Sequence, residues 1–241
     1  MSENSVTIKR ELIEIFKKYN WKENNLNRKV KSTKTLKHNL THKNNELIKD
    51  VNTYYMNKKC IDNYDVNGNL IESSSYDYRG IRTALLIPTY HSNDYVNTYK
   101  YYDDNDVLLS ECFFKYLKNG NVIEKWGNGI TLIEYHLQKN TIEQFFCDTD
   151  NNLIWKDAYK YDKNRNLVAF CNDLGKTICI VNALGNDIEE IKYDSNNNVT
   201  EKKKVKYKLD KYKNWIEKKE YLIENNVEIP ITIFEREIIY Y

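Results

Sequence analysis

The feature that most constrains the fold of this chain is a short unit that recurs along its length. In the clearest copies, a tyrosine and an aspartate precede polar residues, and an asparagine followed by Leu or Val closes the unit. The clearest copies are 64–71, 161–168 and 193–200; copies with a changed first position are 147–154 and 209–216; looser copies are 41–48, 102–108 and 117–123. Such recurrence indicates a repeat architecture.

Each unit has the chemistry of a β-hairpin. A strand ends in the aromatic residue, and the aspartate accepts hydrogen bonds from the backbone of the turn. The chain has 33 Asn but only 7 Gly. Asparagine tolerates a positive φ better than most residues, so it can take the left-handed turn positions that glycine usually occupies. The apolar residue then opens the return strand.

Strand patterns support this interpretation. Residues 204–209 alternate strictly, with three lysines on one face and Val205, Tyr207 and Leu209 on the other. Residues 229–233 alternate as well, and Pro230 predicts that they form an edge strand. We therefore predict a mainly β fold: an antiparallel repeat sheet of successive hairpins, an extended or curled β-meander.

The N-terminal segment has a different period. Ile8, Leu12, Ile15, Phe16 and Tyr19 recur at helical spacing with polar residues between them. This stripe predicts one short amphipathic helix over about residues 6–19, docked on the sheet. The expected organisation is an N-terminal helical segment, 1–25, followed by a β-sheet domain, 26–241.

The repeat units resemble the YD repeats of the RHS family. The resemblance covers residues 41–241 in patches, and the closing residues 210–218 and 234–241 resemble the last units of short bacterial RHS-like proteins. Most units lack the turn glycine of that family; only Gly68 and Gly120 supply it. The resemblance implies a continuous sheet of hairpins and a bacterial origin. It implies no catalytic residues at these positions.

Charge and cysteine content bear on the compartment. The N-terminus lacks the basic-then-apolar layout of a secretory signal, and the longest uncharged apolar run, 84–88, is too short to span a bilayer. We expect a cytoplasmic protein with no membrane partner.

The five cysteines are scattered and contain no CxxC pair, which favours reduced, structural thiols. Residues 1–50 hold 12 Lys/Arg against 6 Asp/Glu. No nucleic-acid motif accompanies this basic segment, so a solvated surface is the favoured interpretation.

The chain matches none of the known sequence motifs for catalysis or metal binding in full. His38 and His42 have HxxxH spacing but lack the glutamate of a zinc protease. The run from Asp148 begins like a calcium loop but lacks the glycine and the final glutamate, so turn capping is favoured, with weak calcium binding left open. His91 and His136 have no partner nearby in sequence. No catalytic residue, metal ligand or cofactor is predicted.

The remaining signal is aromatic. One sheet cannot bury both of its faces, so some aromatic residues should be exposed, and exposed Tyr and Trp favour interfaces. The predicted partner-binding residues are Tyr101, Tyr102, Trp126, Trp155, Tyr159 and Tyr161.

The favoured function is a non-catalytic cytoplasmic protein-binding module, most specifically an immunity protein that neutralises a cognate bacterial toxin. Residues 51–241 carry 25 Lys/Arg against 29 Asp/Glu, which suits a basic toxin domain. A carbohydrate-binding module with Tyr/Trp ladders is the first alternative. An enzyme with a site assembled from distant residues is the second.

Overall fold

The structure, a computed structural model, confirms an all-β, antiparallel chain. It describes residues 26–43, 46–50, 59–91, 95–117, 121–127, 129–136, 140–163 and 166–241. These residues form seventeen strands and no helix, and hence none that is long and apolar enough to cross a membrane. The predicted helix, like the whole segment 1–25, lies outside the described residues, so the expected division at residue 25 stays a prediction.

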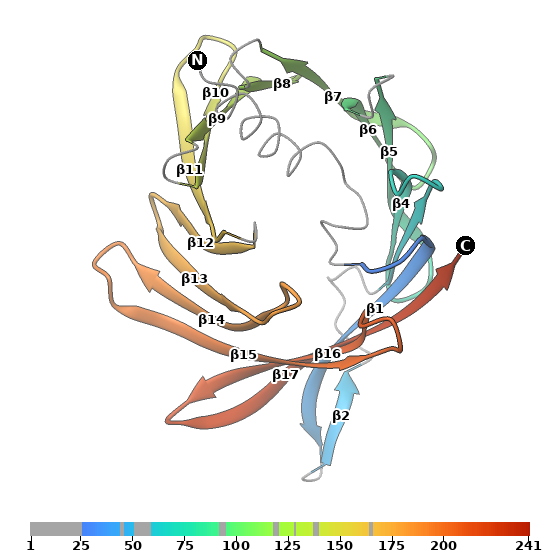
Figure 1. Ribbon diagram of the computed structural model, residues 1–241, viewed down its shortest axis with the longest axis vertical. Coiled ribbons are helices and arrows are strands. Elements are labelled where there is room, and N and C mark those ends of the chain that lie inside the picture. The colour runs from blue at the N-terminus through green and yellow to red at the C-terminus, as the bar shows by residue number, and fades with distance from the viewer. Residues whose placement is uncertain are drawn as a thin grey trace. The chain divides into compact units, whose positions relative to one another are not determined.

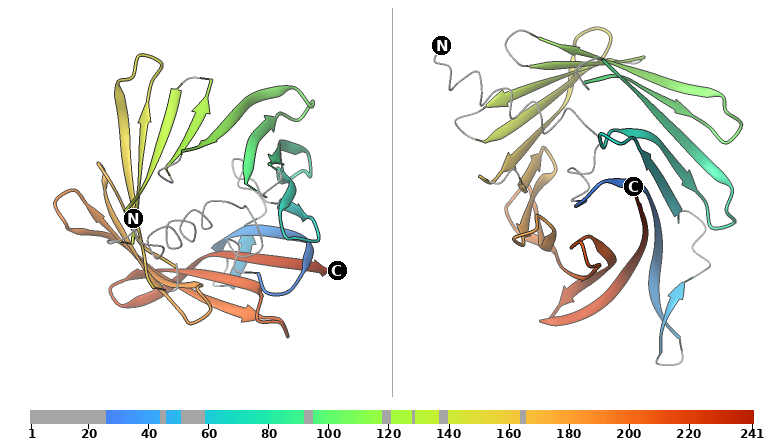
Figure 2. Two further views of the ribbon diagram at one scale, coloured as in Figure 1. Left: turned by 45° about the horizontal axis from the view of Figure 1, so that its top comes forward. Right: turned by 45° about the vertical axis from the view of Figure 1, so that its right-hand side comes forward.

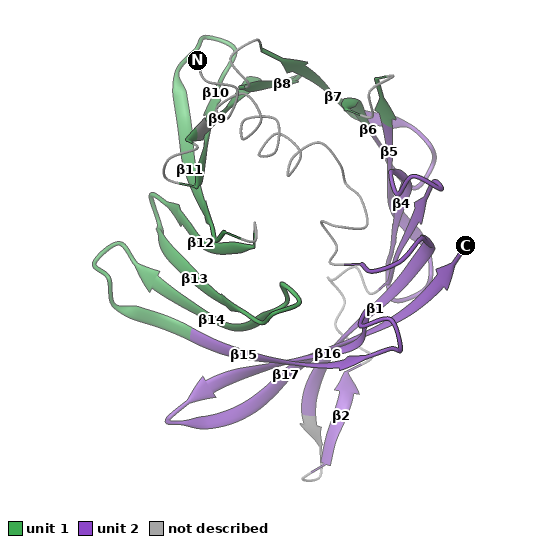
Figure 3. Cartoon of the chain, viewed as in Figure 1, with its two compact units in different colours: residues 1–18, 89–99, 110–201 green, residues 19–88, 100–109, 202–241 purple. Residues whose placement is uncertain are grey.

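The chain divides into two compact units (Figure 3). Unit 1 holds the described residues of 89–99 and 110–201, and unit 2 holds those of 26–88, 100–109 and 202–241. The strands contained in unit 1 are β8 (Val122–Trp126), β9 (Gly129–His136), β10 (Thr141–Cys147), β11 (Leu153–Tyr161), β12 (Leu167–Asn172), β13 (Gly175–Val181) and β14 (Asp187–Asp194). Each pairs antiparallel with the next (Figure 1).

Four strands contribute residues to both units. They are β5 (Arg82–Tyr90), β6 (Val96–Tyr102), β7 (Leu108–Tyr116) and β15 (Val199–Leu209). The strands contained in unit 2 are β1 (Val30–Lys43), β2 (Glu46–Asp50), β3 (Lys59–Tyr64), β4 (Leu70–Tyr76), β16 (Trp215–Glu224) and β17 (Val227–Tyr240).

Unit 2 departs from the predicted array of successive hairpins. Strand β1 pairs with β2 and β3 along one side and with β17, the last strand, along the other. Figure 2 shows β1 in blue beside β17 in red. The unpaired N–H and C=O groups of a sheet edge favour such pairing, which removes an exposed edge from both strands.

The predicted edge strand at 229–233 is confirmed for 229–231, which have no partner in β1, and is wrong from Thr232 onward. From Thr232 to Tyr240 this strand is paired with β1, and it also pairs with β16. Pro230 itself lies beyond the last residue that pairs with β1, and it faces a register shift in β16. Proline is tolerated there because no second neighbour needs its missing N–H.

The hairpin turns follow one plan, which confirms the predicted turn chemistry. The first residue of each turn accepts hydrogen bonds at its Oδ1 atom from the backbone N–H groups of the residues two and four positions later. The residue three positions after the first has a positive φ. In these turns, this residue is Gly68, Gly80, Asp106, Asn151, Gly185, Asn197 or Lys213. The corresponding first residues are Asp65, Asp77, Asp103, Asp148, Asn182, Asp194 and Asp210. The turns at Asp77 and Asn182 were not predicted.

Each unit has a small core. In unit 1, Val122, Ile133 and Ile142 are almost fully buried, and Phe114, Tyr116, Tyr159 and Tyr161 pack against them. In unit 2 the buried cluster consists of Leu26, Val30, Tyr64 and Leu70. Most other strand side chains are half-buried.

Candidate functional site on unit 1

The strand register of unit 1 gathers aromatic and acidic side chains on one face. Successive cross-strand pairs align Tyr116, Val122, Ile133, Gln144 and Asp157 in one row. The next row holds Phe114, Glu124, Thr131, Phe146 and Trp155. We call the set Phe114, Tyr116, Glu124, Trp126, Phe146, Trp155, Asp157 and Tyr159 the aromatic–acidic face.

A glycine makes room for the largest rings of this face. A Cβ atom at Gly129 would lie 2.3 Å from the backbone oxygen of Cys147 and 2.8 Å from the ring of Phe146. The Phe146 ring therefore occupies the space over the glycine. It stacks on Trp155 with centroids 5.5 Å apart and planes 13° from parallel. A pair of this kind contributes about 0.5–1.5 kcal/mol beyond the area that it buries.

Glu124 is the first acidic group of the face. Desolvation raises its pKa above the ordinary value, and a hydrogen bond with the Trp126 side chain partly opposes this shift. Burial and the charge of Glu124 also raise the pKa of Cys112 to about 12. Among the described residues, Glu124 forms no ion pair. It is therefore a carboxylate whose charge is poorly compensated within its own unit.

Asp157 is the second acidic group. Desolvation raises its pKa, the Tyr159 side chain lowers it, and the charge of Asp173 raises it further. The Tyr159 hydroxyl donates to Asp157 Oδ2 at 3.4 Å. No cation of the described chain pairs with Asp157 either. The two desolvated carboxylates thus lie among aromatic rings, on the same side of the sheet as the buried Val122 and Ile133.

The structure brings together four of the six predicted partner-binding residues. Trp155 and Tyr159 lie on this face of β11, and Trp126 lies at the end of β8. Tyr161 packs against the buried core of unit 1, as does Tyr159. Tyr101 and Tyr102 belong to unit 2, at the end of β6, and are not part of this face.

Sequence analysis did not single out Gly129, Phe146 or the two carboxylates. The alternation of Val122, Glu124 and Trp126 along β8 was a usable signal, because it places an acid between two residues of an otherwise apolar face. With 35 Asp and Glu in the chain, however, no pair could be distinguished without the register.

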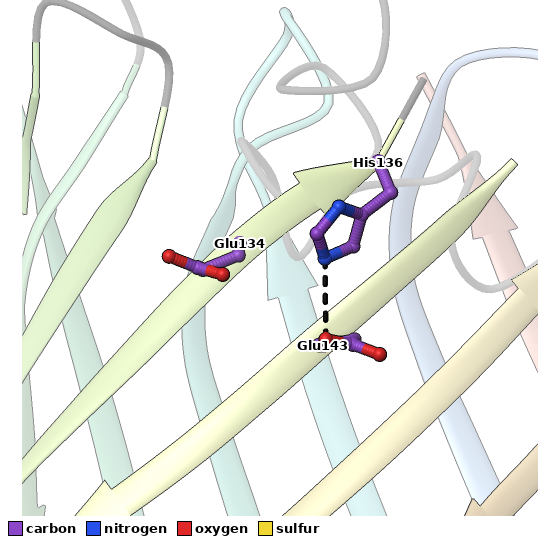
Figure 4. A group of neighbouring side chains, drawn as sticks. All are labelled: Glu134, His136 and Glu143. Carbon is purple, nitrogen blue, oxygen red and sulfur yellow. Dashed lines mark hydrogen bonds and ion pairs between the residues drawn. The ribbon is translucent and has the colours of Figure 1, made fainter. Parts of the chain in front are cut away.

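The opposite face of β9 and β10 carries a group that could hold a metal. Glu134, His136 and Glu143 lie there with one ligand atom of each within 4.8 Å of the others (Figure 4). This is the one such group among the described residues. His136 has no close partner in the sequence, yet the hairpin places its Nε2 atom 3.2 Å from Glu143.

The other candidates from the sequence lie in structural roles. Asp148 caps its turn, with Oδ1 accepting two backbone N–H groups and Oδ2 accepting the Asn152 amide, as predicted. His38 pairs with Glu235 at 3.4 Å, and the side chain of His42 lies outside the described residues.

The five cysteines are free thiols in the structure. Burial and Asp62 raise the pKa of Cys60 to about 11, and burial and nearby carboxylates raise that of Cys179 to about 11. At neutral pH these thiols are protonated, which makes them poor nucleophiles.

Comparison with known proteins assigns no family. No family model and no curated protein matches the chain. Among solved structures, the chain is similar to a porin-like protein from Bacteroides uniformis, with a TM-score of 0.40 and 12% identity over 87% of this chain and 96% of that one.

Two further structures illustrate the range of these similarities. A TcdB2-TccC3-Cdc42 structure matches with a TM-score of 0.33 and 13% identity over 82% of this chain but 11% of that one. A DUF1329 family protein from Desulfovibrio piger matches with a TM-score of 0.30 and 6% identity over 86% and 84% of the two chains. Likenesses this weak assign neither family nor function, and the relation to YD repeats stays a prediction.

Proposed function

We propose that this chain is a non-catalytic, cytoplasmic protein-binding module, and most specifically an immunity protein that neutralises a basic bacterial toxin domain. The observation that carries the proposal is the aromatic–acidic face of unit 1. There, Glu124 and Asp157 are desolvated and lie beside aromatic rings, with no pairing cation in the described chain.

The chemistry of this face suits lysine and arginine side chains of a partner. A charge-assisted hydrogen bond to a carboxylate contributes about 1.5–3 kcal/mol, and a cation over an aromatic ring contributes about 0.5–2 kcal/mol. A basic partner would supply the charge that each carboxylate lacks. Tyr and Trp are also the residues most enriched at the centres of protein interfaces.

The direct experiment asks whether a toxin gene lies next to the gene for this protein and co-expresses the two. Co-expression of the intact chain should rescue cells from that toxin, and calorimetry with the inactivated toxin domain should show tight, salt-sensitive binding. We expect Trp155→Ala and Glu124→Gln each to weaken binding by at least about tenfold, because each removes a hot-spot contact of about 1.4 kcal/mol or more.

A matched control separates this face from the rest of the surface. Tyr78 is 39% exposed in the turn of another hairpin, so Tyr78→Ala should leave binding unchanged. The proposal is wrong if co-expression gives no rescue, or if Trp155→Ala and Tyr78→Ala have the same effect on affinity.

The carbohydrate-binding alternative uses the same rings. Sugars stack on aromatic faces, and carboxylates accept hydrogen bonds from their hydroxyl groups, so the aromatic–acidic face would serve this function as well. Hits on a glycan array that depend on Trp155, together with quenching of tryptophan fluorescence, would favour it over the toxin partner. Weak salt dependence would point the same way, because neutral sugars release no counterions.

A further inference from the structure

The β9–β10 hairpin places three metal-ligating side chains on the face opposite the aromatic–acidic one. Glu134 and His136 are two residues apart on β9, so they project to the same side. Glu143 lies directly opposite Glu134 on β10. Figure 4 shows His136 on β9 facing Glu143 on β10, with Glu134 beside them on β9. His136 is the last residue of β9, and Glu143 is the third residue of β10, so the group lies at the end of the hairpin where β9 stops and β10 begins.

The distances fit a transition metal. Zinc lies about 2.0–2.2 Å from nitrogen and oxygen ligands in tetrahedral sites, so two such ligands lie about 3.4 Å from each other. The observed distance between His136 Nε2 and Glu143 Oε2 is 3.2 Å. The ligand atom of Glu134 lies within 4.8 Å of both, so only a small side-chain movement is needed to complete the set.

Residues outside the group contact both carboxylates. The Lys156 ammonium lies 3.2 Å from Glu143 Oε1, while Oε2 of the same carboxylate faces His136. The Asn121 amide donates to Glu134 Oε1 at 3.4 Å. Donors of this kind orient ligating carboxylates in metalloproteins, and their loss lowers metal affinity by about 10–100-fold.

We propose that Glu134, His136 and Glu143 bind one divalent transition-metal ion, with Zn²⁺ as the probe and Lys156 as a positioning residue. Imidazole and carboxylate ligands suit Zn²⁺, whereas Mg²⁺ prefers oxygen ligands only. Three protein ligands leave a coordination position for water or for a group of a bound molecule. The side chain of His136 is 37% exposed and that of Glu143 is 28% exposed, so the ion can reach them from solvent.

Unit 2 contains a natural control for this site. His38 Nε2 lies 3.4 Å from Glu235 Oε2, and Lys49 binds the same carboxylate oxygen at 2.6 Å. This group has the histidine, the carboxylate and the lysine, but among the described residues it lacks the second carboxylate. It should therefore bind zinc far more weakly.

The experiment titrates the full chain, under reducing conditions, with ZnCl₂ in a calorimeter and with CoCl₂ in a spectrophotometer. We expect one zinc site that MgCl₂ does not compete for. His136→Gln and Glu134→Gln should each lower its affinity by at least about tenfold, Lys156→Met should lower it by about tenfold, and His38→Gln should leave it unchanged. Bound Co²⁺ should show visible absorption without a thiolate charge-transfer band, because no cysteine is a ligand.

Three outcomes would overturn the proposal: no zinc site on the folded chain, equal effects of His136→Gln and His38→Gln, or a thiolate band in the cobalt spectrum. The last result would assign the metal to the free cysteines. Far-UV circular dichroism of each variant checks that the sheet is intact, so a loss of binding is not a loss of fold. The result does not depend on whether the proposed toxin partner exists.

Discussion

Glu124 lies among aromatic rings, where ionisation is opposed by desolvation. Its ordinary pKa is 4.5, and the folded state raises this value. Between the ordinary and the raised pKa, the folded chain binds more protons than the unfolded chain. The stability that Glu124 contributes is therefore fully present below pH 4.5 and is lost as the pH rises through the folded pKa.

The first prediction at the residue scale concerns Glu124→Gln. An amide has no charge to desolvate, so the free energy of unfolding of the variant at neutral pH should exceed that of the wild type. Urea unfolding between pH 4 and 8 measures the effect, which should shrink toward pH 4. A variant less stable than the wild type at every pH would contradict the assignment of desolvation as the main cause. The same variant is expected to bind a basic partner less well, so stability and binding should change in opposite directions.

The second residue-scale prediction concerns Gly129. Gly129→Ala should destabilise the fold by about 1–3 kcal/mol, because its Cβ would overlap Cys147 O and displace the Phe146 ring. Near-UV circular dichroism should report the disturbed Phe146–Trp155 stack. Gly127 provides the control, since nothing lies within 4 Å of a Cβ at that position, and Gly127→Ala should leave the spectrum unchanged.

At the scale of elements, one turn has a role that its copies lack. Asn214 is fully buried. Its Nδ2 atom donates hydrogen bonds to the Asn27 carbonyl at 3.0 Å and to the Tyr240 hydroxyl at 2.7 Å. Its Oδ1 atom accepts a hydrogen bond from the Asn27 backbone N–H. The Tyr240 hydroxyl also donates to Asp210, the first residue of the turn. The turn thus joins the start of the described chain to the end of β17 within unit 2.

We therefore expect Asn214→Ala to cost about 2–4 kcal/mol, since it removes three hydrogen bonds and leaves buried polar groups unpaired. Asn198 holds the same position in an exposed turn, where its amide bonds only to Asp194. Asn198→Ala should cost less than about 1 kcal/mol. Equal losses in urea unfolding would show that the tertiary contacts of Asn214 contribute little.

For the whole molecule, the pairing of β1 with β17 is the contact that joins the most distant parts of the sequence within unit 2. It runs from Val30 opposite Tyr240 to Asn39 opposite Thr232. Because β17 is also paired with β16, the backbone of its second half is flanked by neighbours on both sides. This makes β17 a central strand of unit 2 from Thr232 onward.

Proline in this part of β17 should therefore be severely destabilising. Ile233, which is 6% exposed, lies opposite His38 on one side and Lys219 on the other. Ile233→Pro should cost about 3 kcal/mol or more, while Ile233→Val should cost about 1 kcal/mol. Guanidinium unfolding measures both. A proline variant as stable as the valine variant would mean that β17 is an edge strand after all.

The local chemistry of the turns could be predicted because each turn is complete within five residues. An aspartate oxygen, two backbone N–H groups and a residue with a positive φ are all encoded side by side. The turns at Asp77 and Asn182 were missed because Arg82 and Asp187 stand where the other units have an apolar residue after the turn, and because Asn182 replaces the usual aspartate. Asp106 and Lys213 show that surrounding strands can also impose a positive φ on other residues.

The sequence by itself determined the antiparallel β character and the hairpin turns, because both depend on residues that are close in the chain. Only the tertiary structure decided which strands are neighbours, and with them the pairing of β1 with β17. It also decided that Glu124 and Asp157 share a face with Phe146 and Trp155, and that Glu143 lies against His136. These outcomes depend on cross-strand register, and register is set by contacts between strands and by turn lengths, which no single segment contains.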